Sequence, residues 1–269
     1  MKAVSLLYHD AVEGAHRIDE SGFPGPGAAP YKLDVETMRA HLRALAGATA
    51  RKPSLATEML EDNRHGVPLL ITFDDGGKSA SGSIADMLNA LNWPAHFFVT
   101  TDYIGTSTFM DADDIRRMRQ AGHVIGSHSA SHPTRMAACD RVALLAEWRA
   151  SKARLEEILQ EEVVTASVPG GYYARAVAET ASEAGIRLLF TSEPVKRVMR
   201  VGSCLVLGRY NLWRGMRPAV SAQLGTENLS AAQARQYMLW NAKKLVKQLG
   251  GRRYLVWRRK LLDKSNRSP

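Results

Sequence analysis

The chain has 269 residues, of which 45% are hydrophobic and 23% charged, as in an ordinary globular protein with one large domain. Its only cysteines, Cys139 and Cys204, exclude a disulfide framework and a cysteine-based zinc site. The net charge of +9 lies wholly in residues 243–269, which hold ten Lys or Arg and one Asp, so the rest of the chain is formally neutral. This distribution argues against nucleic-acid binding by the domain as a whole.

The N-terminal residues 1–10 contain no apolar run long enough for a signal peptide. No stretch of the chain reaches the roughly 18 apolar residues that a membrane-spanning helix needs. We therefore expect a cytoplasmic protein.

Apolar runs of strand length alternate with helical patterns along most of the chain. The expected strands are Val4–Tyr8, Leu69–Phe73, Ala95–Thr100, Val124–Ser127, Val164–Val168, Ile186–Thr191 and Cys204–Leu207. The expected helices are Asp34–Leu45, Ser81–Leu91, Asp111–Ala121, Asp140–Leu159 and Ala174–Ala184. Seven such strands predict an α/β fold with a parallel, barrel-like sheet, and a doubly wound open sheet is the alternative.

Two regions break this alternation. Residues 12–30 end in the Pro- and Gly-rich loop Gly22–Pro30, which in a barrel would overhang the active face because it follows the first strand. After residue 208 the pattern weakens, and we expect one further helix over Ser230–Leu249, capped by Ser230. We place a catalytic domain at residues 1–242 and a basic tail at residues 243–269.

Two short motifs carry the chemistry. Residues 71–77 read ITFDDGG, and residues 126–133 read GSHSASHP. Two histidines at i and i+4 can project from one face of a helical turn. One Asp and two His supply three ligands to a metal and leave a position open for water and substrate. The second Asp is then free to act as a general base.

Each motif has an ordinary structural explanation when it is taken alone. An Asp-Asp-Gly-Gly sequence often forms only a turn after a strand, and a His-x3-His pair often lies on a solvated helix face. Their order, with each motif at the end of an expected strand, favours a shared site.

Together the two motifs resemble those of the polysaccharide deacetylase (NodB-homology) family, carbohydrate esterase family four. Residues 167–173, SVPGGYY, look like the third motif of that family. The resemblance covers about residues 1–210 and implies a distorted (β/α)7 barrel. It also implies removal of N-acetyl groups from amino sugars with one divalent metal, zinc or alternatively Co2+ or Ni2+.

By position, Asp75, His128 and His132 match the family's metal ligands, and Asp74 matches its general base. A carboxylate next to a metal stays ionised, whereas its neighbour facing the water accepts a proton. A backbone N–H near Gly171-Tyr172 would stabilise the tetrahedral oxyanion.

The chain departs from the family pattern at two places. Ser167 stands where many members have an Arg that orients the base, and Arg209 stands where many have the His that acts as general acid. No histidine follows His132. His9, at the end of the first strand, resembles the N-terminal catalytic His of a circularly permuted branch, the biofilm poly-N-acetylglucosamine deacetylases. The alternative is a structural His at a strand end, and Asp10 either orients the His9 ring or is a turn residue.

The expected substrate is therefore an N-acetylated glycan or a lipid-linked sugar. The tail sequence around Tyr254, Trp257 and Leu261 places aromatic and apolar residues on one helical face among cations, which suits an anionic membrane surface. The alternative for the tail is a helix packed on the barrel. The competing functions are a catalytically silent carbohydrate-binding protein and a deformylase or amidase acting on a related small amide.

Overall fold

The computed structural model describes residues 1–49, 51–61 and 66–244. The strands of its main sheet are β1 (Val4–Tyr8), β4 (Leu69–Phe73), β5 (His96–Val99), β6 (Val124–Ser127), β7 (Thr165–Ser167), β8 (Leu188–Phe190), β9 (Met199–Val201), β10 (Cys204–Leu207) and β11 (Tyr210–Asn211). Their spatial order is β11-β1-β4-β5-β6-β7-β8-β10-β9, and all neighbours are parallel except the β10–β9 pair. A second sheet pairs β2 (Ala11–Val12) with β3 (Leu33–Asp34).

The main sheet curls because one chain segment reaches both of its ends. Strand β10 pairs with β8, and three residues after β10 ends, β11 begins and pairs with β1. Strands β10 and β11 thus share one position, which gives seven parallel positions around the curled sheet. This arrangement confirms the expected distorted (β/α)7 barrel, and the open doubly wound alternative is wrong.

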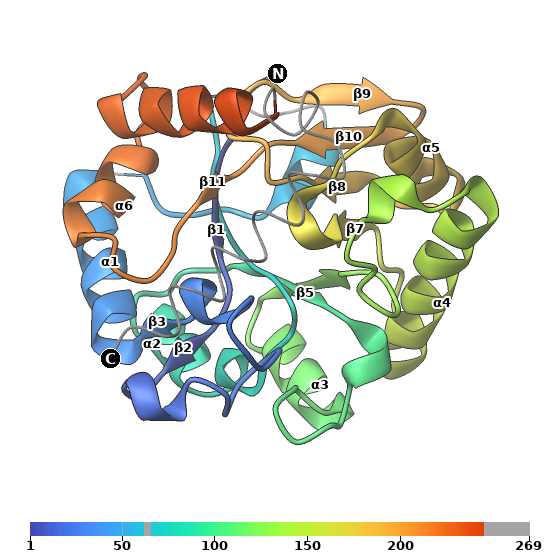
Figure 1. The fold of residues 1–269 in the computed structure, drawn as a ribbon, viewed down its shortest axis with the longest axis horizontal. Helices are drawn as coiled ribbons and strands as arrows, with labels where there is room; N and C mark the ends of the chain where they lie inside the picture. The colour runs from blue at the N-terminus through green and yellow to red at the C-terminus, as the bar shows by residue number, and fades with distance from the viewer. Residues whose placement is uncertain (50, 62–65, 245–269) are drawn as a thin grey trace.

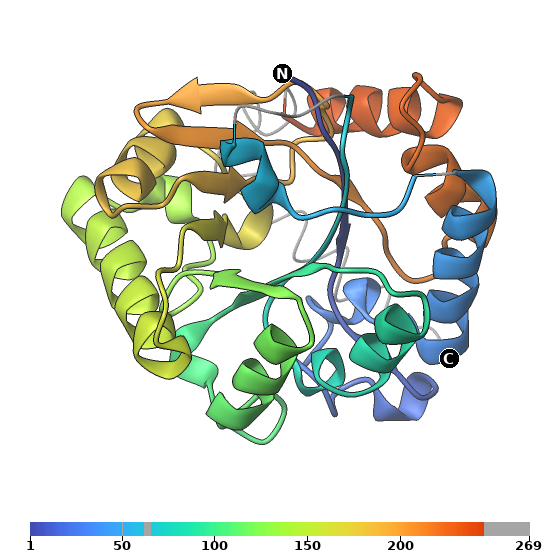
Figure 2. The ribbon, with the colours of Figure 1, turned by 180° about the vertical axis from the view of Figure 1, so that it is seen from behind.

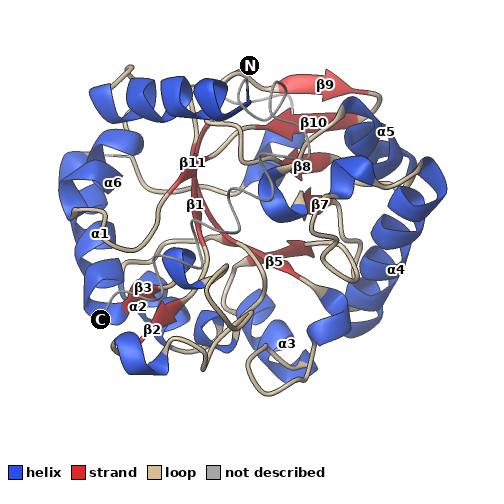
Figure 3. Ribbon diagram, viewed as in Figure 1, coloured by secondary structure: helices blue, strands red, loops and turns tan. Residues whose placement is uncertain are grey.

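Helices surround the curled sheet (Figure 1; Figure 3). They are α1 (Val35–Ala48), α2 (Ser83–Ala90), α3 (Ala112–Gln120), α4 (Arg141–Leu159), α5 (Arg175–Glu183), α6 (Pro218–Leu224) and a last helix described over 231–244. Short 3-10 turns are η1 (Ala15–Arg17), η2 (Ala29–Tyr31), η3 (Ala56–Leu60), η4 (Lys78–Ala80), η5 (Thr101–Tyr103), η6 (Met136–Ala138) and η7 (Pro169–Gly171). Asp34, Asp111 and Asp140 start α1, α3 and α4 by accepting backbone N–H groups of the first turn, which have no partner within the helix.

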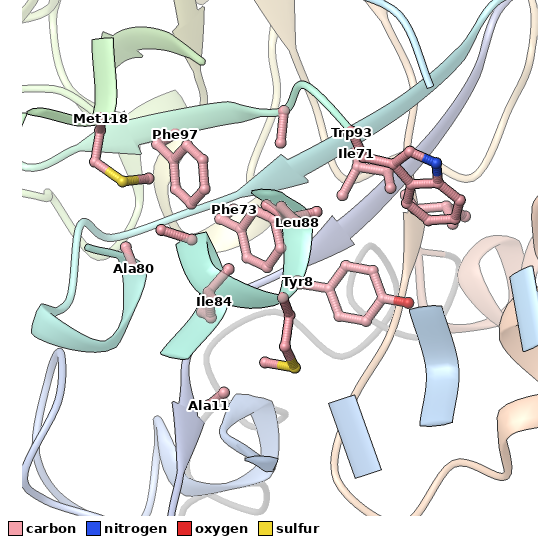
Figure 4. Close-up of a cluster of buried hydrophobic side chains, with 14 of the residues drawn as sticks. Tyr8, Ala11, Ile71, Phe73, Ala80, Ile84, Leu88, Trp93, Phe97 and Met118 are labelled. Carbon is pink, nitrogen blue, oxygen red and sulfur yellow. The ribbon is translucent and has the colours of Figure 1, made fainter. Parts of the chain in front are cut away.

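Aromatic packing fixes the ends of the strands that lead to His9 and to the first motif. The Phe73 ring stacks on Tyr8 at 5.6 Å and on Phe97 at 4.9 Å between centroids (Figure 4). All three side chains are buried, and burying each such side chain contributes about 1.5–3 kcal/mol. This cluster holds the ends of β1 and β4 in place directly before His9 and Asp74.

The expected strands and the first five helices are present with boundaries shifted by at most three residues. The sequence did not indicate β2, β3, β9, β11 or α6, all of which are short. The expected helix Ser230–Leu249 is described over 231–244, with Ser230 Oγ accepting the Gln233 N–H at 3.2 Å. Its remainder and tail residues 245–269 lie outside the described residues. In the described part, no helix has the length and hydropathy needed to cross a bilayer.

Candidate active site

Parallel strands bring all three motifs, residues 71–77, 126–133 and 167–173, together at one end of the barrel. Asp74 and Asp75 directly follow β4, His128 directly follows β6, and Ser167 ends β7. The carboxyl ends of these strands share one face because the strands are neighbours in a parallel sheet. Figure 2 shows the curled sheet from behind, with β1 and β4 running through its centre.

Three side chains form a cluster with ligand spacing. Asp75 Oδ1 lies 3.4 Å from His128 Nε2 and 3.6 Å from His132 Nε2. One ligand atom from each residue lies within 4.8 Å of the others. Two imidazole nitrogens and one carboxylate oxygen suit a divalent metal such as zinc. The donor set and its spacing therefore fit the metal that the sequence predicts.

The backbone at these ligands is strained. Asp75 and His132 have φ angles of 76° and 58°, and Ser129 between the histidines has a φ of 63°. Non-glycine residues rarely adopt this region, and such strain concentrates at functional sites. The expected helical turn for the His-x3-His pair is wrong, because Ser129 and His132 in the left-handed region fold it into an irregular loop. Ser127 Oγ and Ser129 Oγ hold that loop by accepting the N–H groups of Ser129 and His132, both at 3.1 Å.

Electrostatics keep this cluster ready to bind a cation. Burial acts to raise the pKa of Asp75, but the hydrogen bond from His128 and the nearby charge of His9 outweigh it, so the pKa of Asp75 is lowered. Burial lowers the pKa of His132 to about 4, with a further contribution from His128. At neutral pH the carboxylate is ionised and the His132 ring is neutral, which are the forms that bind a metal.

Asp74 is held by an arginine that the sequence did not assign to the site. Arg209 Nη1 and Nη2 donate to the Asp74 oxygens Oδ1 and Oδ2 at 2.7 and 2.8 Å, and the Arg209 side chain is fully buried. Arg209 also donates to the Thr191 carbonyl at 3.0 Å and to Thr72 Oγ1 at 3.1 Å. Burial acts to raise the pKa of Asp74, but the Arg209 charge outweighs it and the net pKa is lowered.

Ser167 joins Asp74, the proposed base, to one of the proposed ligands. Its hydroxyl donates to Asp74 Oδ1 at 3.0 Å and lies 2.5 Å from His128 Nδ1. Ser167 and Arg209 therefore share the orienting task that the family pattern gives to one Arg at the Ser167 position. The sequence held a signal for this role. The third motif lacks the Arg that orients the base in many family members, and Arg209 is an Arg close to the end of another barrel strand.

His9 lies at the same face, next to Asp74. The Asp74 N–H donates to the Tyr8 carbonyl at 3.0 Å, and the neighbouring His9 side chain contributes to lowering the pKa values of Asp74 and Asp75. Strand β1 is paired with β11 through Leu6–Tyr210, so the ends of the first and last parallel strands are neighbours, as expected. His9 packs against Tyr31, with ring centroids 4.8 Å apart.

Asp10 makes no contact with His9 among the described interactions. Its Oδ1 accepts the hydroxyl protons of Ser21 at 2.5 Å and Ser79 at 2.8 Å. A Cβ on Gly77 would lie 2.0 Å from the same oxygen, so only glycine fits beside it. Asp10 is therefore a structural link between the loop after β1 and the loop after Asp75, and the idea that it orients the His9 ring is wrong.

The Pro- and Gly-rich loop covers the site, as its position after β1 predicts. The Phe23 ring packs at 4.7 Å from the His132 ring and contacts Tyr103 and Phe109 edge-on. This apolar lid covers one side of the proposed metal ligands and reduces their exposure to water.

The third motif forms a tight turn, η7, with both glycines at positive φ, 65° for Gly170 and 68° for Gly171. A Cβ on Gly170 would lie 2.7 Å from the Thr134 carbonyl oxygen, and the Arg135 guanidinium lies over the Tyr172 ring at 5.3 Å. The turn thus packs against the segment that directly follows His132. Gly171 and Tyr172 therefore lie in a turn that adjoins the loop carrying His132.

Comparison with known proteins supports a family assignment. Residues 61–189 match the family model described as polysaccharide deacetylase. A chitin deacetylase from Colletotrichum lindemuthianum is 29% identical over 122 residues, 42% of this chain and 49% of the relative. A chitooligosaccharide deacetylase from Rhizobium leguminosarum bv. trifolii is 28% identical over 120 residues, 44% of this chain and 54% of the relative. The chain thus spans about half the length of these curated relatives.

Solved structures share the fold at low sequence identity. The Streptococcus pyogenes deacetylase PplD is similar with a TM-score of 0.69 and 18% identity, covering 84% of this chain and 99% of that one. IcaB from Ammonifex degensii gives a TM-score of 0.65 and 20% identity, covering 84% and 97%. The polysaccharide deacetylase family model thus matches residues 61–189 of this chain, and the fold around that segment is the fold of these solved structures.

Proposed function

We propose that the protein is a metal-dependent hydrolase that removes N-acetyl groups from amino sugars of a polysaccharide or glycolipid. The observation that carries this proposal is the pairing of two adjacent aspartates with separate roles. Asp75 lies among two histidines at ligand spacing, whereas Asp74 is bound by Arg209 and Ser167 and takes no part in the three-residue cluster. A carbohydrate-binding protein without activity has no need for this division.

Asp75, His128 and His132 would hold one divalent metal, zinc or alternatively Co2+ or Ni2+. Bound there, the metal would lower the pKa of a water molecule and polarise the acetyl carbonyl. The three protein ligands leave room for water and substrate, as in other catalytic zinc sites.

Asp74 accepts the proton of the attacking water in this proposal. Its Oδ2 has one described hydrogen-bond donor, Arg209 Nη2, and lies 3.9 Å from His128 Nε2. A lone pair of Oδ2 thus remains free on the side of the ligands. The lowered pKa of Asp74 keeps the carboxylate ionised and able to accept a proton at neutral pH.

Attack on the acetyl carbon produces a tetrahedral oxyanion, which a backbone N–H of the Gly171-Tyr172 turn stabilises. His9 then donates a proton to the departing amine nitrogen, and acetate and the free amino sugar are released. Among the described residues, His9 and the proposed ligand His128 are the only histidines that directly follow a parallel strand, which supports His9 as the acid. This role corresponds to the permuted branch with an N-terminal catalytic His.

We also propose that the basic tail holds the protein at an anionic membrane surface, at the inner face of the cell membrane. The support is the sequence alone, because the tail lies outside the described residues from residue 245 onward. Each cation near anionic lipid contributes about 1 kcal/mol, so several together suffice for peripheral binding.

Release of acetate from an N-acetylated chito-oligosaccharide tests the proposed activity. The wild-type protein with zinc should release acetate, and Asp74→Asn should keep the metal while losing about 100- to 10,000-fold in turnover. A protein that binds the oligosaccharide and one zinc but releases no acetate would be a carbohydrate-binding protein instead. Faster release of formate from an N-formyl substrate would favour the deformylase alternative.

A further inference from the structure

The last helix, residues 231–244, lies along the edge of the molecule beyond β11 and next to α6 (Figure 1). Its inward residues recur at helical spacing and each makes a contact that fixes the helix. Gln233 Nε2 donates to the carbonyls of Leu224 and Thr226, both at 2.9 Å. Three residues on, Gln236 accepts the Asn211 N–H at 3.1 Å and donates to the Asn211 carbonyl at 2.7 Å. Asn211 ends β11, two residues after Arg209, so the helix is attached directly beside the partner of Asp74.

Trp240 lies one turn further along the same face, i+4 from Gln236. The end of its indole ring, Cη2, lies 3.7 Å from the position that a Cβ would take on Gly171. One turn later, Lys244 Nζ reaches Glu193 Oε1 at 3.4 Å, in the loop after β8. The helix therefore spans from the end of β11 to the turn η7, with Trp240 against the proposed oxyanion turn.

Among the residues that the structure describes, the indole N–H of Trp240 has no hydrogen-bond partner. Nε1 is buried and makes no hydrogen bond, and the ring as a whole is half-buried. Buried Trp N–H groups usually find an acceptor, and Trp148 shows the usual case, since its Nε1 donates to the Val177 carbonyl at 3.3 Å. Leaving a buried donor unsatisfied is costly, so this position is better explained by a ligand oxygen than by packing alone.

The opposite face of the helix carries ordinary exposed residues. Tyr237, Met238 and Leu239 are 51%, 63% and 46% exposed. They point away from the inward residues, so they offer matched positions at which a substitution leaves the site untouched.

We propose that Trp240 is a substrate-binding residue that contacts the sugar ring bearing the acetyl group, with its Nε1–H donating to a sugar oxygen. An amphipathic indole suits this task, because its ring covers the apolar face of a pyranose while its N–H satisfies a polar group. The inference rests on the proposed deacetylase function, and it extends the site to a helix that carries none of the three motifs.

The test compares Trp240→Phe, which keeps an aromatic ring and loses the N–H, with Trp240→Ala and the control Met238→Ala. Binding of N-acetylated chitotetraose to the zinc-loaded full chain is measured by calorimetry, and kcat and KM are measured by acetate release. One lost hydrogen bond corresponds to a rise of about 2- to 10-fold in Kd and KM for Trp240→Phe. Trp240→Ala should give a larger rise, with kcat changed less than KM, and Met238→Ala should match wild type.

The outcomes separate this inference from the proposed function. Trp240-dependent binding of the sugar without any acetate release would refute the deacetylase function and support the binding role. Acetate release with wild-type Kd and KM in both Trp240 variants would overturn the binding role and leave the function standing. A lower melting temperature of Trp240→Phe with unchanged Kd would assign the ring to packing alone. Absence of binding and of acetate release by wild type would refute both for this class of sugar.

Discussion

Replacing Arg209 with Met tests how the site stabilises Asp74. The guanidinium is fully buried and donates to both oxygens of a carboxylate that is itself 5% exposed. Removing one partner of a buried ion pair leaves the other charge unpaired and destabilises by about 3–5 kcal/mol. That is a large share of the roughly 5–15 kcal/mol that stabilises a typical domain. We therefore expect Arg209→Met to lower the free energy of unfolding, measured with urea, by about 3–5 kcal/mol. The variant should also lose most of its turnover.

A surface ion pair supplies the matched control. Arg175 Nε lies 2.8 Å from Glu179 Oε1, and the two side chains are 76% and 42% exposed. Exposed pairs contribute about 0–1 kcal/mol, so Arg175→Met should unfold nearly as wild type does. A loss below about 1 kcal/mol for Arg209→Met would show that the buried pair is not the support that we describe.

The pH dependence of stability gives a second readout of the same change. In the wild type the pKa of Asp74 is lowered. The ionised carboxylate therefore stabilises the folded state fully above the unfolded-state pKa, and this stabilisation is lost only as the pH falls through the lowered value. Without Arg209, burial raises the pKa of Asp74, and the sign reverses: stability falls as the pH rises from about 4 toward the raised pKa. Arg209→Met should therefore lose more stability at pH 8 than at pH 5. An equal loss at both pH values would contradict this assignment.

Four further variants test the remaining roles. His128→Ala and His132→Ala should each lose zinc and activity together, because two protein ligands hold zinc poorly; full zinc content measured by atomic absorption would remove these residues from the ligand set. His9→Ala should keep the metal and slow an amide substrate more than an activated ester, whose leaving group needs no proton; wild-type amide turnover would assign the acid elsewhere. Changing five tail cations to Gln should release the protein from anionic vesicles, in the same direction as added salt, while activity on a soluble oligosaccharide survives; salt-independent vesicle binding would contradict the membrane proposal. The five cations are Arg252, Arg253, Arg258, Arg259 and Lys260.

The cluster of Asp75, His128 and His132 could be predicted because its signals are local. Two short motifs at strand ends fix the residue types, and a parallel sheet brings neighbouring strand ends together. The loop conformation of the histidine pair could not be predicted from its spacing, because i and i+4 equally describe a helical turn. The positive φ angles of Ser129 and His132 accompany hydrogen bonds that their own N–H groups donate to the hydroxyls of Ser127 and Ser129, a pairing that the spacing of the histidines does not reveal.

The role of Arg209 depends on contacts across the whole barrel. It lies 135 residues from Asp74 in sequence, and the two meet only because β11 pairs with β1 and closes the curled sheet. Trp240 presents the same difficulty, since it lies on a helix without a motif and reaches Gly171 only through the packing of that helix on β11. For Asp10 the local sequence was misleading. Its position next to His9 suggested that it orients the His9 ring, but its carboxylate instead accepts hydrogen bonds from Ser21 and Ser79.

Metal titration of the chelated protein tests the central claim most directly. Acetate release from an N-acetylated chito-oligosaccharide should be absent after chelation and should rise with added zinc to a plateau at one zinc per chain, with Asp75→Ala giving neither zinc uptake nor activity. Full acetate release by protein that contains no metal, or zinc uptake at wild-type stoichiometry by Asp75→Ala, would contradict the account.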